Sequence, residues 1–253
     1  MTAAAGAARG STGRRRGRWL LREPSDAPMR LFCLPYSGCG ASMYRAWPRY
    51  VGELEVCPVQ PPGRENRLRE PGHGTYQELA ADLIANLGPY LDRPFGLFGH
   101  CGSALAAYET AVQLCAGGHR RPAALFVSSQ VAPQDGPYGT LLTMDDRQLR
   151  EALRALFMEM GNPPPGEDLL DVGLRTLRVD VGANARYVVP EPYRLPAPVV
   201  SIGWAGDDKV PAALMTGWPR CGPTTTHLLP GHHFSFLQAP PALLDTLVAA
   251  MTS

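Results

Sequence analysis

The stretch PFGLFGHCGSALAAYE, residues 94–109, constrains the fold of this chain more than any other. Its apolar first part predicts a buried strand over 95–100, and its alanine-rich second part predicts a helix over 102–117. A strand that turns into a helix without a loop needs small residues two positions before and two after the turn residue, because larger ones would make strand and helix collide. Gly99 and Ser103 meet this need and leave Cys101 at the turn, where a G-x-S-x-G sequence carries a nucleophilic serine.

Strand-like and helix-like segments alternate along most of the chain. Continuous apolar runs predict strands at 29–37, 55–60, 95–100, 124–130, 198–205 and 226–231. Helices are predicted over 75–91, over 102–117 and after Pro240-Pro241, and Thr75 with Glu78 fits a capping box at the start of the first. Apolar strands separated by helices predict an α/β fold with a mostly parallel central sheet flanked by helices.

The alternation breaks between residues 132 and 190. Two helical segments, 143–161 and 169–188, lie there, separated by the linker NPPPGED. The alternative interpretation of this segment is an ordinary crossover connection between two strands, but nearly 60 residues is long for such a connection. We therefore expect a helical lid at 132–190, between core segments 28–131 and 191–253.

The N-terminal residues differ in composition from the rest. Residues 1–23 contain six arginines and one acidic residue, and the segment has no apolar core of a secretory signal. We expect a disordered basic tail over 1–27, either a solvated extension or, as the alternative, an arm for an anionic partner. Without residues 1–23 the net charge of +1 becomes −4, from 18 basic and 22 acidic residues, so no nucleic-acid partner is expected.

The cysteine pattern and the hydropathy of the sequence bear on the cellular compartment of the protein. The six cysteines show no C-x-x-C pair and no metal-ligand spacing. No run of 18 apolar residues occurs. We expect a cytoplasmic monomer with reduced thiols, no membrane partner, no metal and no bound cofactor.

Two later segments offer residues that would activate a nucleophile at Cys101. GWAGDDKVP, residues 203–211, follows a predicted strand and contains Asp207 and Asp208. PGHHFSFL, residues 230–237, follows the last predicted strand and contains His232 and His233. The order nucleophile, acid, histidine is one order of catalytic triads, in which imidazole takes the proton of the nucleophile and the carboxylate orients the imidazole. A small buried cysteine with solvated acids and histidines is the alternative.

Four motifs together resemble one family. LFCLPYSGCGASMYRAWP, VQPPGRENRLREP, FGLFGHCGSALAAYE and LLPGHHFSFL are similar to sequences of the discrete type II thioesterases of polyketide and nonribosomal peptide synthetases. The similarity covers about residues 28–250. It implies the α/β-hydrolase fold and favours a lid at 132–190.

The resemblance also implies roles for individual residues. The serine nucleophile of the family falls on Cys101, the acid falls on Asp207 because Val210-Pro211 aligns that loop, and the histidine falls on His233. Asp208 is the alternative acid.

The same motifs imply an oxyanion hole. Its backbone N–H groups would come from Ser37 and from Gly102, the residue after the nucleophile. His100 is interpreted as structural.

The departures from the family fall around this site. Besides the exchange of serine for Cys101, Met-Gly becomes Gly102-Ser103, and GGS becomes Gly38-Cys39-Gly40. Whether Cys39 takes part is left open. Clustered changes that retain the histidine and the acid favour altered chemistry over decay.

Three functions follow from the resemblance. The first is a thioesterase that hydrolyses acyl groups held as phosphopantetheine thioesters, through an acyl-enzyme on Cys101. The second is an acyltransferase or cyclising release enzyme that passes the acyl group to an amine, thiol or hydroxyl. The third is a non-catalytic module that binds carrier proteins. The implied partner is an acyl or peptidyl carrier protein, which the tail or Arg147, Arg150 and Arg154 would meet unless that helix face is merely solvated.

Overall fold

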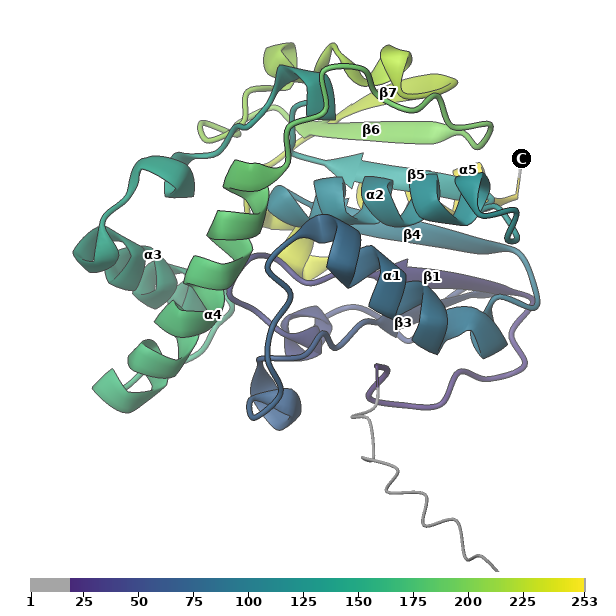
Figure 1. Ribbon diagram of the computed structural model, residues 1–253. Coiled ribbons are helices and arrows are strands. Elements are labelled where there is room, and N and C mark those ends of the chain that lie inside the picture. Colours follow the sequence, from purple (N-terminus) through teal and green to yellow (C-terminus); the bar gives the residue numbers. More distant parts are fainter. Residues whose placement is uncertain (1–18, 253) are drawn as a thin grey trace, which may run out of the picture.

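A computed structural model describes residues 19–252, which form a central sheet between two layers of helices (Figure 1). The sheet has seven strands in the order β2-β3-β1-β4-β5-β6-β7. All neighbours are parallel except β2 and β3. The strands are β1 Met29–Cys33, β2 Tyr50–Val51, β3 Leu54–Pro58, β4 Phe95–His100, β5 Ala124–Ser128, β6 Val199–Trp204 and β7 Thr224–Leu229.

Helices cover both faces of the sheet. The α-helices are α1 Tyr76–Leu87, α2 Gly102–Ala116, α3 Asp146–Glu159, α4 Glu167–Arg186 and α5 Pro241–Met251. Short 3-10 helices are η1 Ala41–Tyr44, η2 Glu65–Arg67, η3 Gly88–Tyr90, η4 Pro133–Asp135, η5 Thr140–Thr143, η6 Ala212–Met215, η7 Trp218–Arg220 and η8 Ser235–Gln238. None of the helices within residues 19–252 is long and apolar enough to cross a membrane.

Side-chain alternation along the strands builds two cores. In β4, Phe95 and Leu97 pack with α1 and α2, whereas Phe98 packs with α5 on the opposite face. Both faces of each central strand are therefore buried, which explains why these strands appear in the sequence as continuous apolar runs. The expected parallel α/β architecture is confirmed.

Element boundaries differ from expectation at a few places. The helix expected over 75–91 ends at Leu87, where η3, which contains Pro89, replaces it. Thr75 caps this helix by accepting from the Glu78 N–H at 3.2 Å, but the Glu78 carboxylate accepts from Gly74 and does not close the box. The two-residue edge strand β2 gives too short a pattern to be predicted.

The insertion between β5 and β6 carries α3 and α4, which pack on each other through a small leucine cluster. Asp145 begins α3 with a reciprocal cap to Gln148. Arg150 pairs with Asp171 and Glu167, and Arg154 pairs with Glu167 at 3.1 Å. These ion pairs within the insertion favour the simple interpretation of its arginines as a solvated helix face. The role of residues 132–190 as a lid remains a prediction.

The expected tail boundary at residue 27 is wrong. Residues 1–18 lie outside the described part, but Trp19 and Leu20 are buried, at 4% and 6% exposure. The Trp19 carbonyl accepts from the Gln60 N–H at 2.8 Å, and Leu20 bridges to Val59 beside β3. The physical reason is that Trp19 and Leu20 supply apolar area that the arginine-rich composition of the segment conceals.

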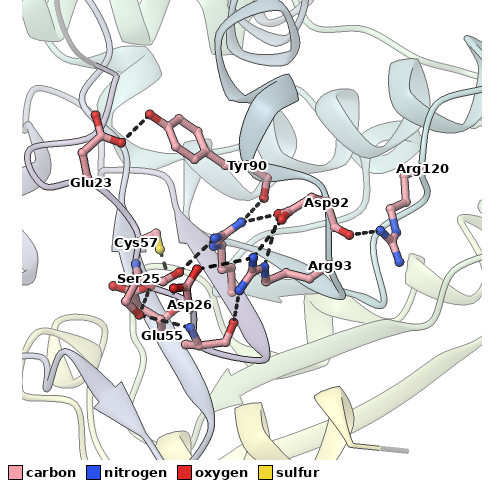
Figure 2. Close-up of polar contacts among 11 residues, drawn as sticks. Glu23, Ser25, Asp26, Glu55, Cys57, Tyr90, Asp92, Arg93 and Arg120 are labelled. Atoms are coloured by element: carbon pink, nitrogen blue, oxygen red, sulfur yellow. Dashed lines mark hydrogen bonds and ion pairs between the residues drawn. The ribbon is translucent and has the colours of Figure 1, made fainter.

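Polar contacts hold the rest of this segment (Figure 2). The backbone N–H and hydroxyl of Ser25 donate to the Glu55 carboxylate at 2.7 and 2.9 Å. The Tyr90 hydroxyl donates to Glu23 at 2.7 Å, and Arg93 donates to the Ala27 carbonyl at 2.9 Å. Residues 19–27 therefore belong to the folded domain.

Candidate active site

Cys101 occupies a strained turn between β4 and α2. Its backbone angles, φ +55° and ψ −134°, define a conformation that residues with side chains rarely adopt. Backbone strain of this kind is concentrated at functional sites. A Cβ at Gly99 would lie 2.2 Å from the Ser103 carbonyl oxygen, so only glycine fits there. Ser103 closes the turn, since its hydroxyl accepts from the His100 N–H at 3.0 Å. The sequence-predicted elbow is therefore present.

The loops after β6 and β7 bring Asp207 and His233 together. Nδ1 of His233 lies 2.8 Å from Oδ2 of Asp207 in a fully buried contact. Asp207 also accepts from the N–H groups of Lys209 and Val210, each at 2.9 Å, and from the Ser129 hydroxyl at 2.7 Å. Four donors thus hold the carboxylate in one orientation.

Electrostatics in this pair favours opposite charges. Burial alone would raise the pKa of Asp207, but its hydrogen bonds to His233, Ser129 and Val210 hold that pKa well below its usual range. Burial alone would lower the pKa of His233, but Asp207 and Cys101 outweigh it and raise the pKa to about 9. The surroundings of His233 therefore favour its protonated form, as a group that accepts a proton from a nucleophile requires.

The structure separates the two candidate acids and the two candidate histidines. Asp208 and His232 are exposed, whereas Asp207 and His233 are buried together. Nδ1 of His232 accepts from the Phe234 N–H at 3.3 Å.

Cys101 and His233 line one cleft. Nε2 of His233 makes no hydrogen bond within residues 19–252, while Cys101 is close enough to contribute to the pKa of His233. The ring of Tyr36 stands edge-on to the imidazole, with centroids 5.9 Å apart. Other residues that line the cleft are Ser37, Gly139, Thr140, Leu141, Val181, Asn184, Lys209 and Val210.

The loop after β1 faces the start of α2. The N–H groups of Ser37 and Gly102 have no hydrogen-bond partner within the described part of the chain. Both are therefore free to donate to an oxyanion. The next residue, Gly38, has a φ of +80° and donates its N–H to Asp180 on α4 at 2.8 Å. Asp180 in turn pairs with Arg64 at 2.9 Å.

An apolar channel leads away from the cleft between the β1 loop and the insertion. It is bounded on one side by Tyr36 and Phe234 and on the other by α3 and α4. Its aliphatic lining consists of Leu141, Met144, Ala152, Leu153, Ala155, Leu156 and Leu177. Ser37, Thr140 and Lys209 also line it, but most of the lining is apolar, which fits a hydrocarbon chain.

Other residues considered from the sequence lie apart from this chemistry. His100 is fully buried, stacks on Phe236 with centroids 3.9 Å apart, and hydrogen-bonds Ser128 at 2.9 Å. Burial raises the pKa of the Cys39 thiol to about 12, which makes it a poor nucleophile. All six cysteines are free thiols, and no cluster of metal-ligating side chains occurs between residues 19 and 252.

The sequence did not reveal Ser129, Tyr36 or Asp180 as part of this site. Ser129 follows β5 with a φ of +47° and bonds the Asp207 carboxylate. The only signal that would have found it is its place directly after a central strand, where parallel sheets gather functional side chains.

Comparisons with known proteins identify the family of this chain. A model of the thioesterase domain family matches residues 29–251. Linear gramicidin dehydrogenase LgrE of Brevibacillus parabrevis is 30% identical over 245 residues, 93% of each chain. Thioesterase PikA5 of Streptomyces venezuelae is 32% identical over 86% of this chain and 80% of its own. The structure of the RedJ thioesterase from the prodiginine pathway of Streptomyces coelicolor superposes with a TM-score of 0.78 at 34% identity, covering 90% of this chain and 88% of that one.

Proposed function

The chain belongs to the thioesterase domain family and is an enzyme of the α/β-hydrolase superfamily, and from this premise we propose that it hydrolyses carrier-bound acyl thioesters through an acyl-enzyme on Cys101. The single observation that carries the proposal is the buried Asp207–His233 pair beside a cysteine at the strand-to-helix turn. A non-catalytic binding module would have no need to bury this ion pair, since burying charges is costly.

The first half of the reaction transfers the acyl group to the enzyme. His233 takes the proton of the Cys101 thiol as the sulfur attacks the thioester carbonyl carbon, so that a new C–S bond forms and the carbonyl electron pair moves to oxygen. The Ser37 and Gly102 N–H groups stabilise that oxyanion. Collapse breaks the original C–S bond, and His233 gives its proton to the leaving thiolate.

The second half releases the product. Neutral His233 removes a proton from water as the water oxygen attacks the acyl carbon on Cys101. Collapse of the second intermediate breaks the bond between the acyl carbon and the Cys101 sulfur, His233 returns the proton to that sulfur, and a carboxylic acid is freed. Asp207 holds the imidazole in the required tautomer throughout.

The substrate follows from the channel and from the relatives. An apolar lining supports an acyl chain as the bound group. Similar solved structures include a thioesterase of the prodiginine pathway and ClbQ of the colibactin NRPS/PKS pathway. This similarity supports an acyl or peptidyl carrier protein as the partner that presents the thioester.

Acyl transfer is the second candidate, and the identity of Cys101 favours it. A cysteine-bound acyl group is itself a thioester, so it stays activated toward an amine, thiol or hydroxyl, whereas a serine would form a more stable oxyester. Water competes less well where the site is dry.

Intact mass spectrometry after mixing with an acyl-loaded carrier protein tests both candidates. The wild type should gain the acyl mass and release free acid, whereas Cys101→Ala should do neither. Cys115→Ala is the matched control, because Cys115 lies at the other end of the same helix, and it should behave as wild type. An acyl adduct that persists in Cys101→Ala would contradict the proposed nucleophile, and an amide or ester product would favour transfer.

A further inference from the structure

Gly102 lies close to two hydroxyl groups that leave little room for a side chain. A Cβ at this position would lie 3.0 Å from the Tyr76 hydroxyl oxygen and 3.1 Å from the Ser37 hydroxyl oxygen. Both distances are shorter than most contacts of a methyl group with oxygen. The glycine therefore lets these two hydroxyls pack against the main chain directly after Cys101.

The Tyr76 hydroxyl is buried and has no partner. Tyr76 is the first residue of α1, its side chain is 5% exposed, and its oxygen makes no hydrogen bond within residues 19–252. Buried hydroxyls are nearly always hydrogen-bonded, so an unpaired one next to a reactive centre requires an explanation.

The surroundings of Tyr76 keep its hydroxyl protonated and oriented. Burial raises the pKa of Tyr76 well above its ordinary value, and the charges of Asp180 and Cys101 raise it further. The short approach to Gly102 places the phenol beside the residue that follows Cys101. The ring of Tyr187 holds that of Tyr76 edge-on, with centroids 5.3 Å apart.

We propose that the Tyr76 hydroxyl is a third donor of the oxyanion hole, a further catalytic residue that acts beside the N–H groups of Gly102 and Ser37. The inference rests on the proposed function, since it needs a thioester carbonyl at Cys101. As the sulfur attacks, the electron pair of the carbonyl moves to oxygen, and this oxygen accepts a hydrogen bond from Tyr76 without taking its proton. The bond is made to charge that develops in the transition state, so it accelerates acylation without tightening ground-state binding.

Tyr76→Phe removes the oxygen and nothing else. The rate constant for acylation of Cys101 by a saturating acyl thioester should fall about a hundredfold, the scale on which loss of one oxyanion donor acts. The KM should stay within about twofold, because uniform binding is unaffected. The loss should be equal for plain, hydroxylated and amino-substituted acyl chains.

Tyr187→Phe is the matched control. It makes the same change in the neighbouring ring, but the Tyr187 hydroxyl donates to Glu109 at 2.7 Å and points away from Cys101. Its acylation rate should equal that of wild type. Thermal melting of both variants separates a catalytic loss from a folding loss.

Gly102→Ala supplies an independent measurement. In the wild type, the added methyl should displace the Tyr76 hydroxyl and slow acylation. In the Tyr76→Phe background it should cost less, because the nearer of the two oxygens that it would meet is gone and only the Ser37 hydroxyl remains. Equal costs in both backgrounds, a normal rate for Tyr76→Phe, or a loss confined to polar acyl chains would each overturn the inference. If wild type itself is not acylated on Cys101, the proposed function fails first.

Discussion

The carboxylate of Asp180, on α4, accepts a hydrogen bond from the main-chain N–H of Gly38 at 2.8 Å. This contact joins the helical insertion to the loop that carries Ser37. Arg64 completes the junction, because its guanidinium pairs with Asp180 at 2.9 Å and donates to the Cys39 carbonyl at 3.0 Å. One carboxylate thus connects the position of the insertion to the geometry of the loop that carries Ser37.

Asp180→Ala should therefore damage both stability and acylation. It leaves the nearly buried Arg64 without its anion, which typically costs about 3–5 kcal/mol, and frees the N–H of Gly38. Urea unfolding and the Cys101 acylation rate measure the two effects. Asp171→Ala, which removes an exposed partner of Arg150 from the same helix, should change neither by much. Equal behaviour of the two variants would contradict the role of Asp180.

The two adjacent histidines should differ sharply in their effect on turnover. His233→Ala removes the proton carrier and should lower turnover about a thousandfold or more. His232→Ala alters an exposed side chain next to it and should cost little. Steady-state hydrolysis of one acyl thioester measures both variants, and comparable losses would show that the assignment of His233 is wrong.

The raised pKa of His233 predicts how stability depends on pH. Its value of about 9 lies above the ordinary 6.5, so the folded state binds the proton more tightly than the unfolded state. The stabilisation is then complete below about pH 6.5 and is lost as the pH rises through about 9. Urea unfolding at a series of pH values should show this decline in the wild type and in Asp208→Asn, and a smaller decline in Asp207→Asn. The same decline in all three proteins would refute the contribution of the pair.

The effect of N-terminal truncation on the melting temperature should depend on whether Trp19 is retained. Deleting residues 1–18 should leave the melting temperature unchanged, because that segment offers no apolar face to bury. Deleting residues 1–23 also removes Trp19 and Leu20 from the core, and with them the stacking of the Arg67 guanidinium 4.7 Å from the Trp19 ring. Trp19→Ala alone should cost about 3–5 kcal/mol. An unchanged melting temperature for the longer deletion would contradict the burial of this segment.

The features of the site that could be predicted from the sequence depend either on local sequence patterns or on the order of the strands. The elbow at Cys101 is visible because Gly99 and Ser103 lie two residues from it, and the Asp207–His233 pair follows from loops after neighbouring parallel strands. The contacts of Ser129 with Asp207 and of Asp180 with Gly38 join residues 78 and 142 positions apart, and no local pattern encodes them. Trp19 was missed because a short apolar segment beside many arginines resembles a tail.

Cys101→Ser separates hydrolysis from transfer. His233 can deprotonate a hydroxyl as well as a thiol, so the variant should still accept an acyl group, though more slowly. If the thiol serves to keep the acyl group activated for an amine or thiol acceptor, the oxyester of the variant should be harder to displace, and transfer should fall more than hydrolysis.

If Cys101 acts only in hydrolysis, as we propose, free acid should be the main product of the wild type even with amine or thiol acceptors present, and Cys101→Ser should keep that product. The measurement is the ratio of free acid to transferred or cyclised product for both proteins, by chromatography of the small molecules. A ratio dominated by free acid in both would exclude transfer as the function of the thiol. A wild type that forms amide or thioester, beside a variant that forms acid, would instead show that the cysteine keeps the acyl group reactive toward acceptors other than water.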